Sequence, residues 1–354
     1  MSNIPDFRVE VNGRDITPVL REARPGPRTA DRPRTRLVSL GLIDKRGSDA
    51  DQLDLVIDDS DGGVELPPTG ATIRVSLGWR SGPDVTPGLV DMGTYIVDDV
   101  GHSGPPDQIT IRARAADFTG AMRVRRERSW HGTTLGAIVA DVAQAHGLKP
   151  RCAAALASIA VTAKAQSRES DLAFLRRLGA DHDAVATIKD GNLILKPTAD
   201  CATVSGTALP AVTIRRRDGD RHDYQVQKQE EATGVSADWH DRDSAKKRTV
   251  TAGKAEGARK LSRTFASEAD ARAAAKAEAG RTSRQPRTLS LSLALGRPDL
   301  KPETPITVSG FKAAIDAQRW VLAEVAHTLG DRGFATGLKL ECAQFGSSGP
   351  SSLT

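Results

Sequence analysis

The chain has 354 residues, of which 38% are hydrophobic and only 4% are aromatic, and its net charge is +5. This length predicts two or three domains, and the low apolar content suggests that part of the stability comes from assembly with other chains. The most apolar run, residues 153–161, is far shorter than the roughly 20 residues that cross a bilayer, so we expect no membrane insertion.

The first predicted domain, residues 1–118, is rich in strand patterns. Apolar and polar residues alternate in three early segments, the period of a strand with one buried face: residues 7–11, 37–42 and 53–57. A Pro- and Arg-rich stretch, residues 24–36, is expected to be an exposed loop or arm.

Two groups of residues resemble metal sites without the required spacing. The first is acidic and lacks the later Glu of a calcium loop, so we interpret it as a polar turn: Asp58, Asp59 and Asp61. The second consists of three cysteines that lie far apart: Cys152, Cys201 and Cys342. We expect reduced thiols, no metal and no cofactor.

The second predicted domain, residues 119–205, changes to helical periodicity. Thr134 is suited to cap a helix, and four apolar residues follow it at helical spacing: Leu135, Ile138, Val139 and Val142. A second helix is predicted over residues 170–179, and a small hairpin over residues 184–195.

A charged triplet follows the second of these helices: Asp181, His182 and Asp183. These residue types can act as acid, base or metal ligand. Adjacent residues rarely point at one substrate, however, so we interpret the triplet as a solvated loop.

The third predicted domain, residues 206–346, returns to strands. One helix interrupts it, because Ser267 and Asp270 resemble a capping box and Gly280 is expected to end the helix. Residues 347–354 are rich in Ser and Gly and are expected to form a flexible tail.

One passage occurs twice, 225 positions apart. The first copy contains Tyr95, Val97 and His102, and the second contains Trp320, Leu322 and His327. Similar strand patterns flank both copies, over residues 73–76 and 109–112 in the first and residues 306–309 and 338–341 in the second. The repeat predicts two related β domains. Both histidines are interpreted as structural, because a catalytic residue has no reason to recur at one topological position.

Positive charge gathers in three clusters: Arg123, Arg125, Arg126 and Arg128; Arg215, Arg216 and Arg217; and the basic residues between positions 246 and 263. Such clusters suit contact with phosphate. No aromatic residues interleave them and no recognised nucleic-acid motif accompanies them. We therefore favour a solvated face or a subunit interface in which arginine meets carboxylates, and we expect no specific nucleic-acid partner.

Five runs of residues, in one collinear order, carry a resemblance to a known family: residues 50–54, 111–118, 129–136, 218–222 and 304–311. They resemble the late control protein D family of contractile-tailed phages. That family is similar to the hub proteins of other contractile tails and to the N-terminal part of type VI secretion spike proteins. The chain departs from the family in a shorter Lys-rich stretch after Trp239.

The resemblance implies a structural tail hub in the baseplate of a virion or phage-tail-like injection particle, made in the host cytoplasm. The implied fold is mainly β with an α+β insertion: two related tail-tube-like β-barrel domains and a helical and hairpin middle domain. Two barrels in each of three chains would present six similar surfaces, so a homotrimer with pseudo-sixfold symmetry would join the hexameric tail tube to the trimeric spike. Baseplate wedge and tape-measure proteins are further expected partners.

Two alternatives come from other classes of function. A DNA-binding regulator of late phage genes is permitted by the basic composition, and a hub with wall-degrading activity is the other. No nucleophile elbow, phosphate loop or zinc-protease motif appears in the sequence. We therefore expect no enzymatic activity and no catalytic residue.

Overall fold

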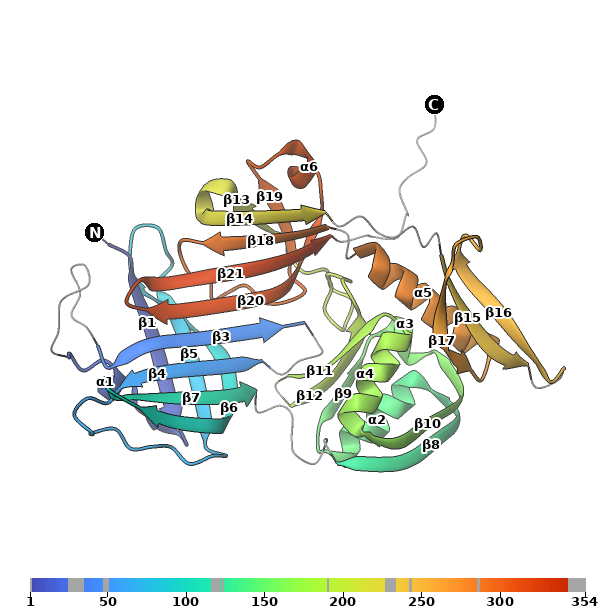
Figure 1. Ribbon diagram of the computed structural model, residues 1–354, viewed down its shortest axis with the longest axis horizontal. Coiled ribbons are helices and arrows are strands. Elements are labelled where there is room, and N and C mark those ends of the chain that lie inside the picture. Colours follow the sequence, from blue (N-terminus) through green and yellow to red (C-terminus); the bar gives the residue numbers. More distant parts are fainter. Residues whose placement is uncertain are drawn as a thin grey trace.

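The computed structural model describes residues 2–24, 35–46, 51–115, 122, 124–189, 191–226, 234–241, 244–284 and 287–342. The fold is mainly β, with one large sheet on one side and two smaller units on the other (Figure 1). Residue 118, where the first predicted domain ends, and the predicted tail lie outside the described residues.

The large sheet has 13 strands in the order β14-β18-β21-β20-β3-β4-β7-β6-β5-β1-β2, with β13 paired to β19 and β19 paired to β20. The first part of the chain supplies β1 (Ile4–Val11), β2 (Arg14–Asp15), β3 (Leu37–Lys45), β4 (Gln52–Asp58), β5 (Thr72–Ser81), β6 (Gly88–Ser103) and β7 (Gln108–Ala115). The last part supplies β13 (Val212–Arg215), β14 (Gly219–Val226), β18 (Arg287–Leu293), β19 (Pro305–Ser309), β20 (Trp320–Gly330) and β21 (Gly333–Cys342). Figure 1 shows the strands from β14 to β6 stacked from top to bottom, with β1 and β5 crossing them.

The expectation of two barrels is not met as closed rings, because the described strands form one open sheet. No pairing joins β1 to β3 among the described residues. Instead, β3 pairs antiparallel with β20, from Lys45 opposite Glu324 to Ser39 opposite Gly330. Since β4 and β20 occupy both edges of β3, the two β units are fused into one sheet.

Each β unit nevertheless has its own apolar core. The first is built around buried side chains such as Leu40, Leu55 and Tyr95. The second is built around Trp320 and Leu322. Burying a large apolar side chain of this kind contributes roughly 2–3 kcal/mol. Short helices lie in the connections between these strands: α1 (Thr17–Leu20), the 3-10 helix η2 (Arg216–Asp218) and α6 (Ala313–Asp316).

The middle unit combines two small sheets with helices. Its elements are β8 (Arg125–Thr134), α2 (Leu135–Ala145), β9 (Lys149–Cys152), α3 (Ala154–Ala157), β10 (Ala160–Ser170), α4 (Asp171–Asp181), β11 (Ala184–Lys189) and β12 (Asn192–Pro197). Both predicted helices are confirmed. Thr134 Oγ1 accepts a hydrogen bond from the Ala137 N–H at 3.2 Å, and Ser170 Oγ accepts one from the Ala173 N–H at 3.2 Å. The predicted hairpin is β11 and β12.

A further unit lies between β14 and β18 in the sequence. It contains β15 (Gly234–Asp241), β16 (Lys246–Gly253), β17 (Arg259–Phe265) and α5 (Glu268–Arg284), and it packs beside the middle unit (Figure 1). The predicted cap is present, since Ser267 Oγ accepts from the Asp270 N–H at 3.2 Å. The helix does not end at Gly280 as predicted but continues to Arg284, and Arg281 donates to the Ala180 carbonyl at 3.1 Å. In the part of the chain that the structure describes, no helix is long and apolar enough to cross a membrane.

Candidate assembly interface

The two copies of the repeated passage lie on β6 and β20 and begin with buried aromatic rings. Tyr95 is 2% exposed and Trp320 is 1% exposed. Tyr95 lies opposite Ile73 of β5, and Trp320 lies opposite Ile306 of β19. The two rings therefore hold the same place in their ladders, although 21 residues lie between Ile73 and Tyr95 and only 13 between Ile306 and Trp320.

The irregularities of the two ladders also coincide. The register shifts directly after Val97 in β6 and directly after Leu322 in β20. Just before each shift, the Val97 N–H donates to the Ala71 carbonyl at 2.9 Å, and the Leu322 N–H donates to the Thr304 carbonyl at 3.0 Å. These bonds support an internal duplication, and superposition of the two halves stays a prediction.

The strands after the repeat align differently from the sequence comparison, which set Ile109 against Leu338. In the structure Val100 lies opposite Ile111, and its counterpart Val325 lies opposite Leu338. Ile111 thus corresponds to Leu338, a shift of two residues. The two hairpins differ in length, since 10 residues lie between Val100 and Ile111 and 12 lie between Val325 and Leu338. Alternation with a period of two cannot reveal a two-residue slip.

The two histidines of the repeat have different surroundings. The His102 side chain is 45% exposed, and its Nε2 lies 3.5 Å from Asp59 Oδ2. His327 is 1% exposed, and its Nδ1 lies 2.9 Å from Thr336 Oγ1. Burial lowers the pKa of His327 to about 4.

The sequence comparison missed a further pair of equivalent strands next to the repeat. Leu55 of β4 lies opposite Ile111 of β7, and Leu291 of β18 lies opposite Leu338 of β21. Beyond β4 and β18, the strands β3 and β14 take equivalent positions. They share no visible sequence pattern because β3 is mostly buried or half-buried while β14 is mostly exposed. Two strand edges without a strand partner among the described residues form the candidate assembly interface: the outer edge of β14, and the part of β6 beyond Ile96, where its pairing with β5 ends.

Two arginines of the first basic cluster, Arg126 and Arg128, contact the carboxylate of Asp171. Asp171 is fully buried and accepts hydrogen bonds from His146 Nε2 at 2.7 Å, from Gln166 Nε2 at 2.8 Å and from Arg128, with Arg126 Nε 3.5 Å away. Burial alone would raise the pKa of Asp171, but these hydrogen bonds hold it below its usual value. Arg123 lies outside the described residues.

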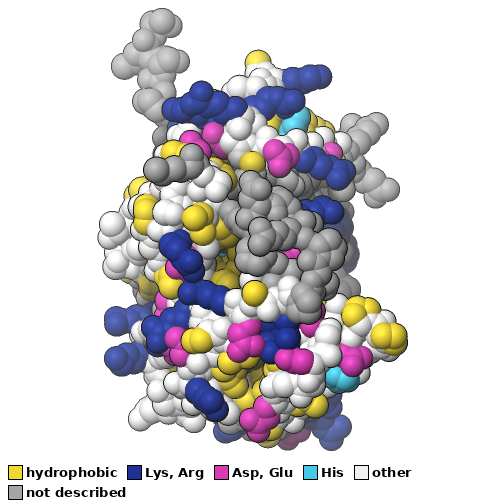
Figure 2. All heavy atoms as spheres, turned by 90° about the vertical axis from the view of Figure 1, so that its left-hand side faces the viewer, with side chains coloured by type: hydrophobic (Ala, Val, Ile, Leu, Met, Phe, Trp, Pro, Cys, Tyr) yellow, Lys and Arg dark blue, Asp and Glu magenta, His cyan; other side chains and the backbone are white. Residues whose placement is uncertain are grey.

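The third cluster and the acidic turn also form ion pairs within the chain, each with its own partners. Lys247 and Lys260 lie 2.7 and 2.8 Å from Asp238 Oδ2, and their hydrogen bonds lower the pKa of that carboxyl. A turn is present where predicted, since the Gly62 N–H donates to the Asp59 carbonyl at 2.7 Å, but Asp58 is the last residue of β4 and both Asp58 and Asp59 are buried. Asp61 accepts from Arg24 and Arg36 at 2.6 and 2.9 Å. On the face that Figure 2 presents, Lys and Arg side chains are interspersed with Asp and Glu. Basic residues of the first and third clusters thus meet carboxylates within one chain, whereas the prediction placed such pairs at a subunit interface.

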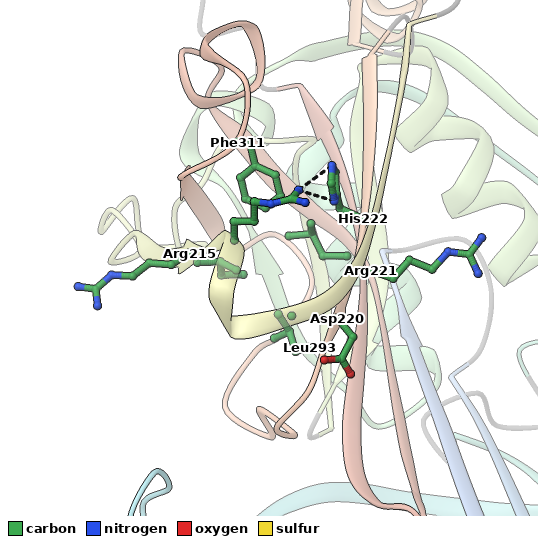
Figure 3. A pocket seen from close by; sticks show the side chains of 10 residues that line it. Arg215, Asp220, Arg221, His222, Leu293 and Phe311 are labelled. Carbon is green, nitrogen blue, oxygen red and sulfur yellow. Dashed lines mark hydrogen bonds between the residues drawn. The ribbon is translucent and has the colours of Figure 1, made fainter.

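Two residues of the second cluster, Arg215 and Arg216, line a cavity of about 60 Å³ between β13 and β14 (Figure 3). Arg216 Nη1 lies 2.8 Å from His222 Nδ1, and the guanidinium carbon lies 5.8 Å from the centre of the Phe311 ring. Arg215 and Arg221 point away from this contact. Arg215 and Arg216 therefore do not converge on one point in this cavity, and all three arginines of the cluster line a second, more open hollow beside Ser309 and Gly310.

The interpretation of the charged triplet as a solvated loop is wrong for Asp181. This residue is 8% exposed and is the last residue of α4. Its carboxylate accepts from Arg263 Nη2 at 2.8 Å and from Lys164 Nζ at 3.3 Å, and Lys164 also lies 3.1 Å from Asp270. The triplet was misread because its partners come from β10, β17 and α5, which no local pattern connects to it.

Comparison with known proteins decides the family. A family model described as phage tail baseplate hub matches residues 52–333. The probable baseplate hub protein of Escherichia phage 186 is 37% identical over an alignment of 378 positions, which includes 95% of this chain and 92% of that protein. The chain belongs to the phage tail baseplate hub family. The corresponding protein of Escherichia phage P2 is also 37% identical, over 95% of this chain and 93% of that protein.

Solved structures show that the baseplate hub fold is shared more widely. A tail protein from Neisseria meningitidis MC58 superimposes with a TM-score of 0.65 at 15% identity, over 96% of both chains. A 43 kDa tail protein of prophage MuSo2 from Shewanella oneidensis gives 0.63 at 14% identity, over 95% and 96% of the two chains. An E. coli component of the type VI secretion system gives 0.52 at 12% identity, over 87% of this chain and 74% of that chain. The resemblance seen in the sequence is confirmed.

Proposed function

We propose that this chain is the structural hub of a contractile phage tail or phage-tail-like injection particle, and that three copies form a ring with pseudo-sixfold symmetry. The observation that carries the proposal is the repeated ladder. Two β units with the same register at Tyr95 and Trp320 stand side by side in one sheet. Three chains would therefore offer six similar surfaces to a hexameric tail tube and threefold symmetry to a trimeric spike.

The proposed divisions of the chain follow the same logic. Residues 1–118 and 206–346 supply the two ring units, residues 119–205 form the middle domain that decorates the ring or reaches toward the spike, and residues 347–354 form the tail. Within the second ring unit, residues 234–284 pack instead beside the middle domain.

The similarity of the fold to secretion spikes supports contact with a spike. A Francisella PdpA–VgrG complex contains a chain that matches with a TM-score of 0.53 at 7% identity, over 96% of this chain and 53% of that one. Baseplate wedge and tape-measure proteins are further proposed partners. The paired basic clusters around Asp171 and Asp238 favour this structural role over a DNA-binding regulator.

The proposal is tested by the mass of the complex between the full chain and its spike protein. Three copies of this chain with three of the spike are expected, together with binding to tube rings. A stable monomer that never joins the spike would contradict the proposal.

A further inference from the structure

The strand β14 is the counterpart of β3 in detail. Leu42 of β3 and Tyr224 of β14 hold the same place in their ladders, opposite equivalent leucines of β4 and β18. Both ladders also shift register at the same point, directly after Leu37 in β3 and directly after Gly219 in β14. A position on β3 can therefore be translated into a position on β14.

These counterpart strands differ in what covers their outer edges. The outer edge of β3 is paired with β20. The outer edge of β14 has no strand partner among the described residues, and its last residue, Val226, is 58% exposed. An edge strand with unpaired backbone groups is a template for another strand.

The second strand edge without a partner among the described residues lies in β6. In β20, the segment after the register shift pairs with β3. The equivalent segment of β6 is residues 99–103. On that side the pairing of β6 with β5 ends at Ile96, and the described residues place no strand beside residues 99–103. Four of these five residues are exposed, and only Val100 is half-buried.

We propose that residues 99–103 of β6 pair antiparallel with β14 of a second copy of this chain, in the register of the joint between β20 and β3. In that joint His327 lies opposite Leu42. Translating both residues through the repeat places His102 opposite Tyr224 of the neighbouring copy. The neighbouring pairs follow: Val100 with Val226, Gly101 with Gln225, and Ser103 with Asp223.

The proposed register would stabilise both strand edges. It satisfies backbone donors and acceptors that both strands otherwise leave to water. It also sets the exposed side chain of Val226 against Val100, a cross-strand apolar pair. The inference rests on the proposed trimer. With eight strands from β14 to β6 in each chain, three chains would close a ring in which the joint between chains repeats the joint within each chain.

The test is disulfide trapping in the complex of the full chain with its spike protein. The first variant carries Gly101→Cys and Gln225→Cys. A Cβ at Gly101 meets no atom within 4 Å, and Gln225 is exposed, so neither change disturbs the fold. The paired Cα atoms would lie within the roughly 4.4–6.8 Å that a disulfide spans. The three native cysteines are free, and the wild-type chain serves as the background.

The matched control carries Gly101→Cys and Arg221→Cys, which moves the second thiol four residues along the same strand, roughly 13 Å away. We expect oxidation to convert most of the first variant into covalent dimers and trimers on non-reducing gels, with little product from the control or from either single variant. A complex that contains three copies but cross-links in the control and not in the first variant would overturn the register alone. A complex without three copies would overturn both the register and the proposed hub.

Discussion

Arg46, directly after β3, donates a 2.5 Å hydrogen bond from Nη2 to Oε2 of Glu341, near the end of β21. Its Nε lies 3.4 Å from Oε1 of Glu303, which is 5% exposed. The other oxygen of Glu303 accepts from the Ala199 N–H at 3.0 Å and lies 3.4 Å from Lys196 Nζ. One buried carboxylate therefore connects both β units and the segment that leads out of the middle unit.

The first prediction is that Glu303→Gln lowers the free energy of unfolding by roughly 2 kcal/mol, because the half-buried cations Arg46 and Lys196 lose a buried charged partner. The loss stays below the full cost of an unpaired charge since Arg46 keeps Glu341. Urea unfolding measures the change. The control is Glu268→Gln, which removes an exposed pair with Arg272 and is expected to cost about 0.5 kcal/mol or less. Equal effects of the two changes would show that Glu303 does not connect the units.

The second prediction concerns the cores of the repeated passage. Val97→Asp or Leu322→Asp would place an unpaired carboxylate at a site that is 2% or 0% exposed, a cost of several kcal/mol that a domain of ordinary stability does not tolerate. We expect no assembled particles by electron microscopy. Val97→Ile and Leu322→Met are the controls, because they preserve apolar contact, and they should leave particle numbers near wild type. Normal particle counts with either aspartate variant would contradict the burial of Val97 and Leu322 in the cores.

The third prediction revises the expectation for the charged triplet. Asp181→Asn should lower the free energy of unfolding by roughly 2 kcal/mol, because Lys164 is 8% exposed and would keep only Asp270 as a charged partner. Asp183→Asn should be nearly neutral, since asparagine tolerates the positive φ of 51° at this position. Thermal unfolding of both variants checks the contrast. A neutral Asp181→Asn would restore the solvated-loop interpretation.

The sequence predicted local features well and long-range ones poorly. The caps at Thr134 and Ser267 were found because a cap and its helix lie within four residues of each other. The pairing of β3 with β20 was missed, because its register is set by residues almost 300 positions apart and not by a local pattern. The environment of Asp181 was missed for the same reason. The repeat at Tyr95 and Trp320 was visible because both copies bury an aromatic ring at one point of the ladder.

The last prediction concerns pH. Burial lowers the pKa of His327 from its ordinary value near 6.5 to about 4. Between these values the unfolded chain binds a proton that the folded chain does not, so His327 makes the fold less stable as the pH falls through this window. Asp51 acts in the opposite direction: burial and repulsion by Asp44 raise its pKa to about 7, so the folded chain binds a proton between pH 3.8 and pH 7 that the unfolded chain lacks. The pH dependence of wild-type stability contains both effects, so variants are needed to separate them.

His327→Gln removes the first effect while keeping a group that can contact Thr336, which lies 2.9 Å from the imidazole. On moving from pH 7 to pH 4.5, the variant should therefore lose about 2 kcal/mol less stability than the wild type. Asp51→Asn should instead lose more than the wild type over the same interval, because it no longer gains from protonation. Urea unfolding at the two pH values measures each difference. Parallel behaviour of His327→Gln and the wild type would mean that the buried imidazole is protonated in the fold, and that Thr336 and its neighbours accommodate the charge.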